Sequence, residues 1–353
     1  MERAELLRWL RETDETRLAE LWARADATRR AHVGDAVHLR GLIEISNHCV
    51  RRCAYCGLRA PNVKLGRYRM TTEQILGCVR QAAALGYGTV VLQAGEDPLL
   101  TTEWVAALVK RIRVETPLAI TLSLGEVDDE ALRAWKAAGA DRYLLRFETS
   151  NRALYDRLHP PRPGRVSDRP AILRRLRELG FEVGSGVMVG LPGQTYDDLV
   201  SDLELFRELD LDMIGLGPYI PHPETPLCAA AARAAGPEQV PNDELTTYKM
   251  IALARLMCPR ANIPSTTALA TLNRAQGREL GLRRGANIVM PNLTPVELRA
   301  QYEIYPGKAC VGETAEACSG CLVERITRIG RTVGTGRGDS PNWTARVGPP
   351  GPA

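Results

Sequence analysis

The sequence predicts an α/β protein folded as a (β/α)8 TIM-type barrel, because short apolar segments alternate with amphipathic helical patterns along most of its length. Eight strand candidates occur within about 250 residues, which is the number and spacing expected of a parallel (β/α)8 barrel. The alternative is a doubly wound open sheet. That fold usually has fewer strands and a G-x-G-x-x-G turn, and no such turn follows the first predicted strand.

The predicted strands are short runs rich in apolar and β-branched residues. In chain order they are LIEIS (42–46), TVVLQ (89–93), AITLSL (119–124), RYLLRFE (142–148), EVGSGVMVG (182–190), DMIGLG (212–217), NIPSTT (262–267) and NIVMPN (287–292). Helical patterns separate them. Two of these helices begin with the residue pair of a capping box, Thr71 with Gln74 and Thr195 with Asp198. The first of the two should end at Gly86, because glycine commonly follows the last turn of a helix.

The barrel is expected to occupy residues 39–300, with flanking segments of different character. Residues 1–38 carry a charged amphipathic pattern and should form an N-terminal helical extension. Residues 301–335 contain a second group of cysteines and should form a C-terminal cap. The last segment, 336–353, is rich in Gly, Pro and Arg and is expected to be a mobile tail.

The composition excludes several classes of protein. Hydrophobic residues make up 44% and charged residues 25% of the 353 positions, as in a soluble globular protein. No run of eighteen apolar residues predicts a membrane span, and the N-terminus lacks the apolar core of a signal peptide. We therefore expect a cytoplasmic protein. The net charge of +4 comes from interspersed basic and acidic residues, so nothing indicates nucleic-acid binding.

Six of the nine cysteines are grouped in two triplets, at 49/53/56 and at 310/318/321. Clustered cysteines in a reducing compartment indicate metal or redox ligands rather than disulfides. Cys49, Cys53 and Cys56 directly follow the first predicted strand, and in a (β/α)8 barrel the chemistry takes place at that end of the strands. Three thiols leave a structural zinc site one ligand short, whereas an iron–sulfur cluster held by three thiolates keeps one iron open for a substrate or cofactor. Zinc and free thiols remain alternatives.

Polar residues follow other predicted strands at the same end. The segment QAGEDP (93–98) comes after the second strand, where a plain turn with acids that cap a helix is the alternative. On the third strand Thr121 and Ser123 are two residues apart and face the same way, as do Arg146 and Glu148 on the fourth. A charged pair within a strand is costly unless its members are paired or line a polar cavity. Cavity groups and a mutual salt bridge are the two interpretations of Arg146 and Glu148.

The first triplet, with Tyr55 before its last cysteine, resembles the signature of the radical S-adenosylmethionine (SAM) enzymes. The resemblance implies a 4Fe–4S cluster on Cys49, Cys53 and Cys56, whose open iron chelates the amino and carboxylate groups of S-adenosylmethionine. In that family one electron from the reduced cluster breaks the sulfur–C5′ bond and releases a 5′-deoxyadenosyl radical. So reactive a radical must form in a closed, dry cavity beside its target, as a barrel interior provides.

The same resemblance implies roles for residues at the other strand ends. QAGED resembles the family's Gly-Gly-Glu segment, with Ala94 in place of the first glycine, and GVMVGLPGQT (186–195) resembles its adenine-side segment. Arg169 resembles the arginine that binds the cofactor carboxylate, with Arg162 and Arg165 as substitutes in the same loop. The implied cofactor-binding residues are Tyr55, Gly95, Glu96, Ser123, Arg146, Glu148 and Arg169.

One branch of this family, the HydE maturases of FeFe-hydrogenase, is similar over residues 30–335. The stretches that carry the similarity are SNHCVRRCAYCGLRAPN, TLSLGE, DRYLLRFET, GLPGQT, GPYIPHPETPL, NIPSTTAL, ANIVMPN and YPGKAC. The resemblance implies a small iron substrate that carries carbonyl, cyanide and cysteine and comes from the maturase HydG, with a radical that attacks its sulfur. The product would contribute to the di-iron centre of the H-cluster on the GTPase HydF. The residues implied near the substrate are Thr121, Thr266, Thr267, Met290, Tyr302 and Tyr305.

The alternatives to this maturase are other enzymes of the family and one protein class without catalysis. Biotin synthase and methylornithine synthase share the barrel and the first triplet, but the C-terminal sequence resembles them less. An iron–sulfur or zinc carrier would use the barrel only to hold metal. Every enzyme of this family also needs an electron donor, which the sequence does not identify.

The second triplet is a separate candidate metal site. Cys310, Cys318 and Cys321 are spaced by eight and three residues, and the resemblance implies an accessory iron–sulfur cluster there, which some HydE proteins lack. Zinc with a further ligand is the alternative. The three isolated cysteines, Cys78, Cys228 and Cys258, are expected to be structural.

Overall fold

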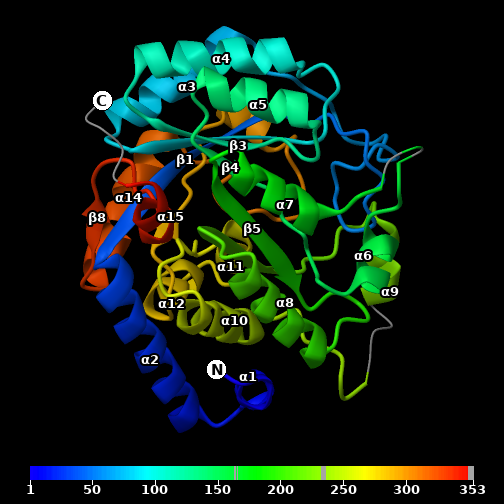
Figure 1. The fold of residues 1–353 in the computed structure, drawn as a ribbon, viewed down its shortest axis with the longest axis vertical. Coiled ribbons are helices and arrows are strands. Elements are labelled where there is room, and N and C mark those ends of the chain that lie inside the picture. The colour runs from blue at the N-terminus through cyan, green and yellow to red at the C-terminus, as the bar shows by residue number, and fades with distance from the viewer. Residues whose placement is uncertain (163, 165, 232–235, 349–353) are drawn as a thin grey trace.

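The computed structural model of the chain describes residues 1–162, 164, 166–231 and 236–348. Its centre is a parallel sheet with the strand order β6-β5-β4-β3-β2-β1-β7, and β8 pairs with β1. Helices surround the sheet, as Figure 1 shows. The strands are β1 Ala36–Ser46, β2 Thr89–Ala94, β3 Ala119–Ser123, β4 Arg142–Leu144, β5 Glu182–Val189, β6 Met213–Pro218, β7 Ile288–Val289 and β8 Thr332–Gly334.

The sheet closes through the segment expected to be the seventh strand. This segment forms only isolated parallel bridges, Asn262 with Met213 of β6 and Pro264 with Ile288 of β7. Pro264 has no N–H to donate to a ladder, and helix α11 begins at Thr267, so a regular strand over 262–267 does not form. The predicted (β/α)8 barrel is confirmed, with bridges in place of one regular strand.

Two strands differ in length from the prediction. β1 begins at Ala36 rather than at residue 42, because Ala36, Val37 and His38 pair with β8 near the other end of the chain. β4 ends at Leu144 instead of residue 148, although Leu145 and Glu148 still donate backbone hydrogen bonds to β5. The extended segment 145–148 therefore stays beside β5 and leaves its side chains at the C-terminal end of the barrel.

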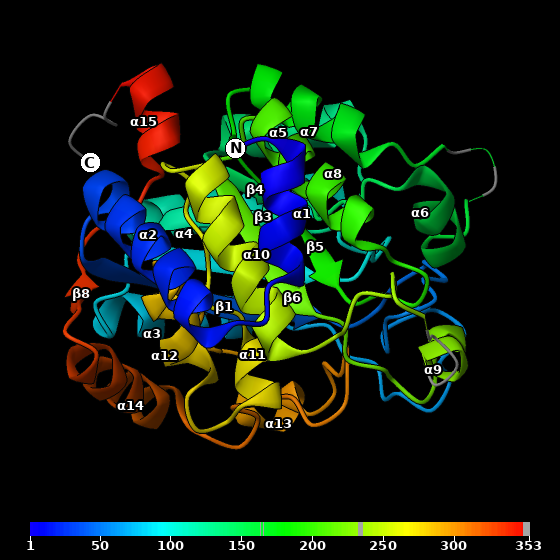
Figure 2. The ribbon, with the colours of Figure 1, turned by 90° about the horizontal axis from the view of Figure 1, so that it is seen from below.

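The main helices cover the outside of the barrel and follow the strands in alternation. They are α1 Arg3–Arg11, α2 Glu15–Val33, α3 Thr72–Ala84, α4 Thr102–Glu115, α5 Asp129–Ala138, α6 Arg152–Leu158, α7 Arg169–Glu178, α8 Tyr196–Glu208, α9 Pro226–Ala231, α10 Glu244–Met257, α11 Thr267–Leu272, α12 Gly277–Arg283, α13 Val296–Arg299, α14 Ala315–Arg328 and α15 Pro341–Val347. Both predicted capping boxes are present, at the starts of α3 and α8. Figure 2 shows that α1 and α2 lie beside α10, outside the sheet. No helix in the described ranges is long and apolar enough to cross a membrane.

The alternation of side chains along the strands separates the hydrophobic core from the barrel interior. Ile120 and Leu122 of β3 are fully buried in the main apolar cluster. Thr121 and Ser123 lie between and after them, so they face the opposite side of the sheet, toward the barrel interior. The core thus holds the strands from outside and leaves polar groups free to line the cavity.

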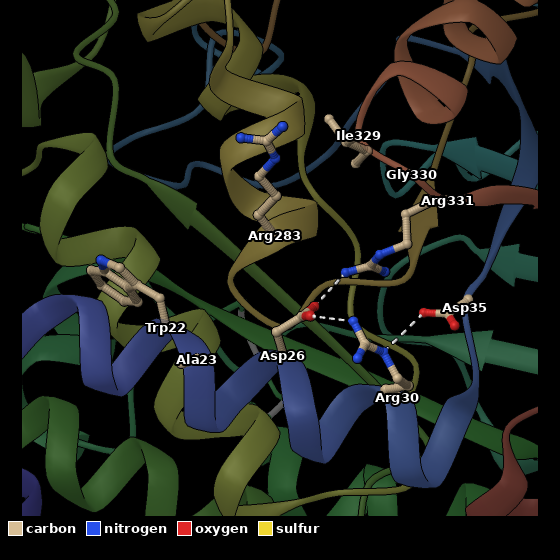
Figure 3. Close-up of a pocket in the computed structure, with 9 residues that line it drawn as sticks. All are labelled: Trp22, Ala23, Asp26, Arg30, Asp35, Arg283, Ile329, Gly330 and Arg331. Carbon is tan, nitrogen blue, oxygen red and sulfur yellow. Dashed lines mark hydrogen bonds and ion pairs between the residues drawn. The ribbon is translucent and has the colours of Figure 1, made fainter.

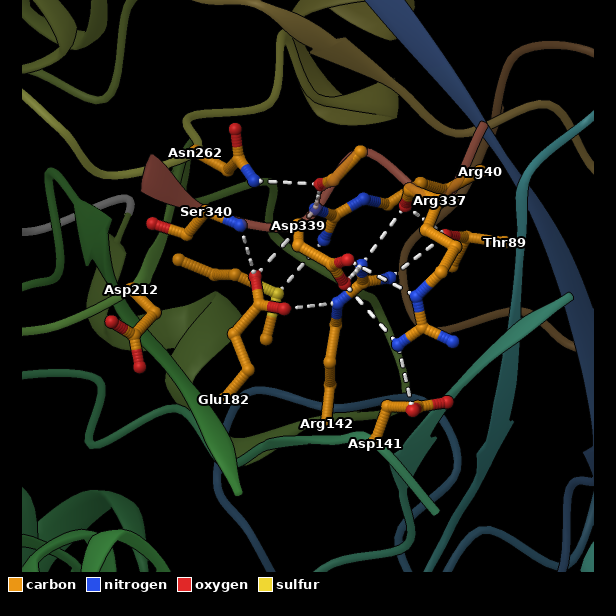
Figure 4. Close-up of polar contacts among 12 residues, drawn as sticks. Arg40, Thr89, Asp141, Arg142, Glu182, Asp212, Asn262, Arg337, Asp339 and Ser340 are labelled. Atoms are coloured by element: carbon orange, nitrogen blue, oxygen red, sulfur yellow. Dashed lines mark hydrogen bonds and ion pairs between the residues drawn. The ribbon is translucent and has the colours of Figure 1, made fainter. Parts of the chain in front are cut away.

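The end of the chain closes the barrel at the N-terminal ends of the strands (Figure 4). Arg142 at the start of β4 is fully buried and bonds both to Glu182 of β5 and to Asp339. The Thr89 hydroxyl of β2 donates to the carbonyl oxygen of Arg337 at 2.8 Å. This end of the barrel is therefore filled by the protein itself.

These contacts correct the expectation of a mobile tail for residues 336–348. Ser340 is fully buried and donates its backbone N–H to Glu182 at 3.0 Å, and α15 follows directly. Arg337 also donates to Asp141 at 2.7 Å. Burial of charged side chains requires partners, and the Gly- and Arg-rich end supplies them. Residues 349–353 lie outside the described part of the chain.

A surface cavity of about 330 Å³ lies where α2 meets residues 329–331 of the cap (Figure 3). Its charged residues pair mainly with one another. Asp26 accepts from Arg331 at 2.6 Å and from Arg30 at 3.4 Å, and Arg30 lies 3.5 Å from Asp35. None of the predicted site residues lines this cavity, so its ion pairs serve to attach the N-terminal helix to the C-terminal cap.

Candidate functional site

The cysteine-containing loop, residues 47–71, connects β1 to α3 at the C-terminal end of the strands. A single cation fixes the shape of this loop. The Arg67 guanidinium donates, at 2.5 to 3.2 Å, to the carbonyl oxygens of four loop residues, Asn47, Leu58, Arg59 and Asn62. Because charge-assisted bonds to four carbonyl groups meet at one side chain, the loop has a defined conformation without regular secondary structure.

Two glycines allow other segments to approach this loop closely. A Cβ atom at Gly95, just after β2, would lie 2.4 Å from the His48 carbonyl oxygen and 2.6 Å from the Cys49 Cβ. A Cβ atom at Gly57 would lie 2.1 Å from the Glu303 carbonyl oxygen. Neither position accommodates a side chain. Gly95, predicted as a cofactor contact, thus brings the end of β2 against Cys49.

The three thiols of Cys49, Cys53 and Cys56 are free and lie at the barrel mouth. Burial raises the pKa of each thiol, that of Cys53 to about 11, so three thiolates are stable here only beside a bound cation. Among the described residues, a single group of three potential metal ligands has all its ligand atoms within 4.8 Å of one another. Cys49, Cys53 and Cys56 do not belong to that group. Two sulfurs on one zinc ion are at most about 4.6 Å apart. At least one pair of these sulfurs is therefore farther apart than a single zinc ion spans.

Tyr55 is half-buried between the cysteines and the fourth strand. Its hydroxyl lies 2.9 Å from His159 Nε2 and 3.5 Å from Glu148 Oε1. His159 is buried and stacks on the Tyr155 ring, with the ring centroids 4.3 Å apart. Burial, with Arg169 nearby, lowers the pKa of His159 far enough to keep its ring neutral. The tyrosine ring is thus fixed at the predicted position by a histidine that the sequence patterns did not indicate.

Arg146 and Glu148 form the mutual salt bridge that was one of the two interpretations, at 3.1 Å. Arg146 also donates to the Val187 carbonyl oxygen at 2.6 Å and keeps 31% of its side chain exposed. Glu148 has a left-handed backbone with φ 64°, held by backbone hydrogen bonds to β5. Such strain in a residue other than glycine is concentrated at functional sites. The pair lies at the C-terminal edge of the barrel, where both side chains remain beside the cavity.

Glu96 is buried beside the cysteine loop and contacts three groups. It accepts from the Glu126 backbone N–H at 3.1 Å and lies 3.8 Å from Arg51 and 3.4 Å from Arg162. Burial raises the pKa of Glu96, and Arg51 acts in the opposite direction. A cavity of about 340 Å³ opens beside Glu96, between α4 and α5. Arg162 therefore reaches the predicted cofactor side of the site, whereas Arg165 lies outside the described residues.

Arg169, the first residue of α7, is buried and directed by an acid that sequence reasoning missed. Its Nε donates to Glu126 Oε1 at 2.8 Å, and its Nη1 donates to the Arg146 carbonyl oxygen at 2.5 Å. Glu126 also accepts from Ser167 at 2.6 Å and lies 3.4 Å from Arg51. Burial opposes ionisation of Glu126, but Arg169 and its other donors together lower its pKa. The only indication of this residue in the sequence is its place after the third strand, where Glu126 ends the stretch TLSLGE.

The predicted threonines and serine come from opposite sides of the barrel. Thr121 is buried, and its hydroxyl has no hydrogen-bond partner in the described part of the protein. The buried hydroxyl of Thr266, at the start of α11, also lacks a partner there. Ser123 and Thr267 are half-buried at the end of β3 and in the first turn of α11. Buried hydroxyls without partners are costly, so water or a polar ligand would have to complete them.

The C-terminal cap supplies the predicted tyrosines and a lysine that was not predicted. Tyr302 is buried, and Lys308 Nζ lies 5.1 Å from the centre of its ring. Lys308 forms an ion pair with Glu44, inside β1, which also accepts from Asn292 at 2.9 Å. Burial raises the pKa of Tyr305, so its hydroxyl stays protonated as a hydrogen-bond donor. Met290, just after β7, is half-buried.

The second cysteine group is only partly the predicted one. The ligand atoms of Cys310, Glu313 and Cys318 lie within 4.8 Å of one another, and the exposed Cys321 is not a member of this group. Arg278 donates to Cys310 Sγ at 3.3 Å. A hydrogen bond from Cys318, with Arg278 nearby, lowers the pKa of Cys310 to about 6. Glu313 was missed because nothing in its local sequence distinguishes it from a surface acid.

Comparison with known proteins agrees with this geometry. Residues 43–233 match the family model of the Radical SAM superfamily. The HydE subunit of the FeFe hydrogenase maturase from Thermotoga maritima is 48% identical over 89% of this chain and 86% of its own length. The 3-methylornithine synthase of Methanosarcina acetivorans is 28% identical over 82% of this chain and 79% of its own length.

A solved structure supports the fold independently. The crystal structure of methylornithine synthase (PylB) superimposes with a TM-score of 0.78 at 24% identity and covers 94% of both chains. At that identity the likeness concerns the fold alone. The family match and the 48% identical relative extend over the cysteine loop and most of the barrel. The chain is therefore a radical SAM enzyme and belongs to the family of the HydE-type FeFe-hydrogenase maturases.

Proposed function

We propose that the chain binds a 4Fe–4S cluster through Cys49, Cys53 and Cys56 and cleaves S-adenosylmethionine reductively. Its substrate is a small iron complex that carries carbonyl, cyanide and cysteine, used in assembly of the FeFe-hydrogenase active site. The observation that carries the proposal is the loop of three free thiols at the mouth of the barrel, in a chain that is 48% identical to a HydE maturase. When bound, the cluster and S-adenosylmethionine supply a 5′-deoxyadenosyl radical.

The residues around the cysteines are placed to bind and orient the cofactor. Arg169 is held by Glu126 and is a buried cation suited to the methionyl carboxylate. Glu148 and Glu96 are buried carboxylates suited to its amino group or to ribose hydroxyls, and Ser123 adds a hydroxyl at the end of β3. Gly95 keeps β2 close to Cys49, and Tyr55 closes the side of the cysteine loop.

The substrate would lie deeper, between β3 and the segment that begins α11. The free hydroxyls of Thr121 and Thr266 would donate to it, and Thr267, Met290 and Tyr305 would complete the wall. Lys308 and Arg146, each paired with a glutamate, would offer N–H donors to the cyanide groups of this complex. Tyr302, packed beneath Lys308, excludes water from that side.

The partners and location follow from the same proposal. HydG would supply the iron precursor, HydF would receive the product, and a separate protein would donate the electron. The barrel, residues 39–300, would carry the chemistry, and the cap, residues 301–335, would hold an accessory metal centre on its cysteines. Nine free cysteines suit a reducing compartment, so we place the enzyme in the cytoplasm.

The test has two parts. Protein reconstituted anaerobically with iron and sulfide and reduced with dithionite should convert S-adenosylmethionine to 5′-deoxyadenosine, measured by chromatography. A metal carrier would produce none. Cells that contain the hydrogenase, HydF and HydG but lack their own HydE should recover hydrogenase activity when this chain is supplied.

The substrate is identified by comparison of candidates under the same conditions. The iron–cysteine complex should increase 5′-deoxyadenosine formation and be consumed, whereas dethiobiotin and lysine should remain unchanged. Consumption of dethiobiotin or lysine, with no recovery of hydrogenase activity, would refute the maturase assignment and leave a biotin-synthase-like or methylornithine-synthase-like enzyme.

A further inference from the structure

The loop that contains the first three cysteines is strongly and uniformly basic. Residues 49–69 include five arginines and one lysine and no aspartate or glutamate. The whole chain has 46 basic and 42 acidic residues, so basic and acidic residues are nearly balanced elsewhere. A stretch of 21 residues with six positive charges and no negative charge is therefore a local feature and does not reflect the overall composition.

Half of these cations have partners that explain their presence. Arg51 lies between Glu96 and Glu126, Arg67 bonds to loop carbonyl groups, and Arg69 bonds to the buried Asp97. These three arginines hold the loop and the strand ends together. Their charge is used inside the protein, and they need no external partner.

The other three cations are exposed or half-buried, and we call them, together with Val63 between them in the chain, the loop face: Arg52, Arg59 and Lys64. Arg52 is exposed and Arg59 half-buried, and neither forms an ion pair with a described residue. Lys64 pairs with Glu224 at 2.8 Å, but 73% of its side chain remains exposed. Val63 is 90% exposed.

The loop face belongs to the same loop as the cysteines. Arg52 stands between Cys49 and Cys53 in the chain, and Arg59 donates to the Arg52 carbonyl oxygen at 3.4 Å. The other side of the same loop carries the buried Cys53 toward the barrel. A protein that rested on the loop face would therefore contact the loop that carries the cysteine sulfurs.

We propose that the loop face is the docking surface for a small acidic protein that carries a one-electron flavin or iron–sulfur centre. The inference rests on the proposed function, because that chemistry consumes one electron in each reductive cleavage. The carrier loses one electron and the cluster held by the cysteines gains it, while no proton or group crosses the interface. Opposite charges on the two surfaces would orient the carrier and speed its encounter with this side of the barrel.

The experiment uses the full-length reconstituted protein with an acidic flavodoxin as the probe. The dissociation constant is measured with oxidised flavodoxin by flavin fluorescence, and cluster reduction by flavodoxin hydroquinone is followed by electron paramagnetic resonance. The test variant is the double charge reversal Arg52→Glu/Arg59→Glu, with Arg52→Gln/Arg59→Gln as a milder form. The control is Arg8→Glu/Arg283→Glu, which makes the same charge change at exposed arginines without described ion pairs on α1 and α12.

At 50 mM NaCl the charge-reversed variant should bind flavodoxin about tenfold more weakly, with a proportionate loss in reduction rate, and the glutamine variant should fall between it and the parent. At 500 mM NaCl the difference should shrink to about twofold, because salt screens exposed charges. Cleavage of S-adenosylmethionine with dithionite should stay within about twofold of the parent in all variants. The control should bind as the parent does.

Equal binding of flavodoxin by the parent and the charge-reversed variant at low salt would overturn the proposal. So would an equal loss in the control variant, because net charge rather than the loop face would then govern docking. Absence of dithionite-driven cleavage in the parent would refute the proposed function instead. The binding measurement does not depend on that activity, so the two failures are distinguishable.

Discussion

The two ends of the barrel use buried polar groups in different ways. At the N-terminal ends of the strands, Arg142 and Glu182 are buried almost completely and bond to each other, and the chain's own residue Asp339 completes the pair. Near the C-terminal ends, the hydroxyl of Thr266, just before α11, is buried and has no partner within the described protein. The first end is filled by the protein, whereas the second carries the residues proposed to bind the cofactor and substrate.

The two ends differ more in how their buried charges are paired than in the number of hydrogen bonds that their polar groups form. Even at the filled end, Arg40 Nε and His38 Nδ1 lack partners among the described residues. Glu182, Asp339 and Asp141, however, each pair with an arginine (Figure 4). In (β/α)8 enzymes the N-terminal face generally serves stability and the C-terminal face chemistry. Substitutions at the N-terminal end should therefore mainly change stability, and substitutions at the C-terminal end should mainly change catalysis.

The largest effect is expected at the cysteine loop. Cys53→Ala should reduce formation of 5′-deoxyadenosine by at least about a hundredfold, because a cluster bound by two thiolates is neither stable nor correctly placed. Cys318→Ala, in the cap, should retain most of the activity. The measurement is 5′-deoxyadenosine per reconstituted protein with dithionite. Equal losses in both variants would contradict this division between the two cysteine groups.

At the opposite end, Arg142→Ala should lower the free energy of unfolding by about 3–5 kcal/mol, because it leaves Glu182 and Asp339 buried without their shared cation. Thermal and urea unfolding followed by circular dichroism measure the change. At a low temperature, where the variant is still folded, its rate of S-adenosylmethionine cleavage should stay within about twofold of the parent's rate. Arg152→Ala, in an exposed pair with Asp156, is the control and should cost less than about 1 kcal/mol. A stable Arg142→Ala variant with lost activity would reverse the roles of the two ends.

A smaller effect involves Asp202 of α8, a fully buried acid beside the segment that follows Glu148. Burial raises the pKa of Asp202 from 3.8 to about 7, although the Ser150 backbone donates to it at 2.6 Å. Between pH 4 and 7 the native protein retains this proton and the unfolded chain does not. This contribution to stability therefore falls as the pH rises through that window.

Asp202→Asn keeps the acceptor for Ser150 and removes the titration. The variant should gain stability relative to the parent progressively from pH 4 to pH 8, by up to a few kcal/mol. Urea unfolding at several pH values measures the difference. Glu182→Gln at the other end provides the contrast, because its carboxylate is paired with Arg142 and the variant should be less stable than the parent at neutral pH. A pH-independent difference for Asp202→Asn would contradict the prediction.

The sequence predicts those parts of the molecule that depend on neighbours in the chain. Alternating apolar residues such as Ile120 and Leu122 predict the strands, and the position of Cys49, Cys53 and Cys56 directly after a strand predicts that they lie at the barrel mouth. The capping box of Thr71 and Gln74 fixes a helix start to the residue. In each case the interacting groups lie within a few positions of one another, so the pattern itself contains the interaction.

Contacts between distant segments could not be read in this way. Arg142 and Asp339 are 197 residues apart in the chain. The composition of the Gly- and Arg-rich end alone is that of a mobile tail, because its sequence does not show the buried partners that order it. Glu126 and Arg169 are 43 residues apart, and only the folded barrel brings them together. Glu313 is different, because it lies only three residues after Cys310 and was missed since an acid there looks like any surface acid. The missed residues are mostly those that orient other side chains.

Glu126→Gln is the substitution with the smallest expected effect, and it tests whether the C-terminal end binds S-adenosylmethionine independently of the N-terminal end. The amide keeps the volume of Glu126 and can still accept from Arg169, but it removes the negative charge that Arg169, Arg51 and Ser167 share. Arg169 should then orient less well toward the methionyl carboxylate, and the dissociation constant for S-adenosylmethionine should rise about tenfold, or about 1.4 kcal/mol. Equilibrium dialysis measures it, and cleavage at saturating cofactor should fall less than threefold. Because Arg142→Ala at the other end should leave this constant unchanged, a rise in both variants would mean that the two ends are coupled.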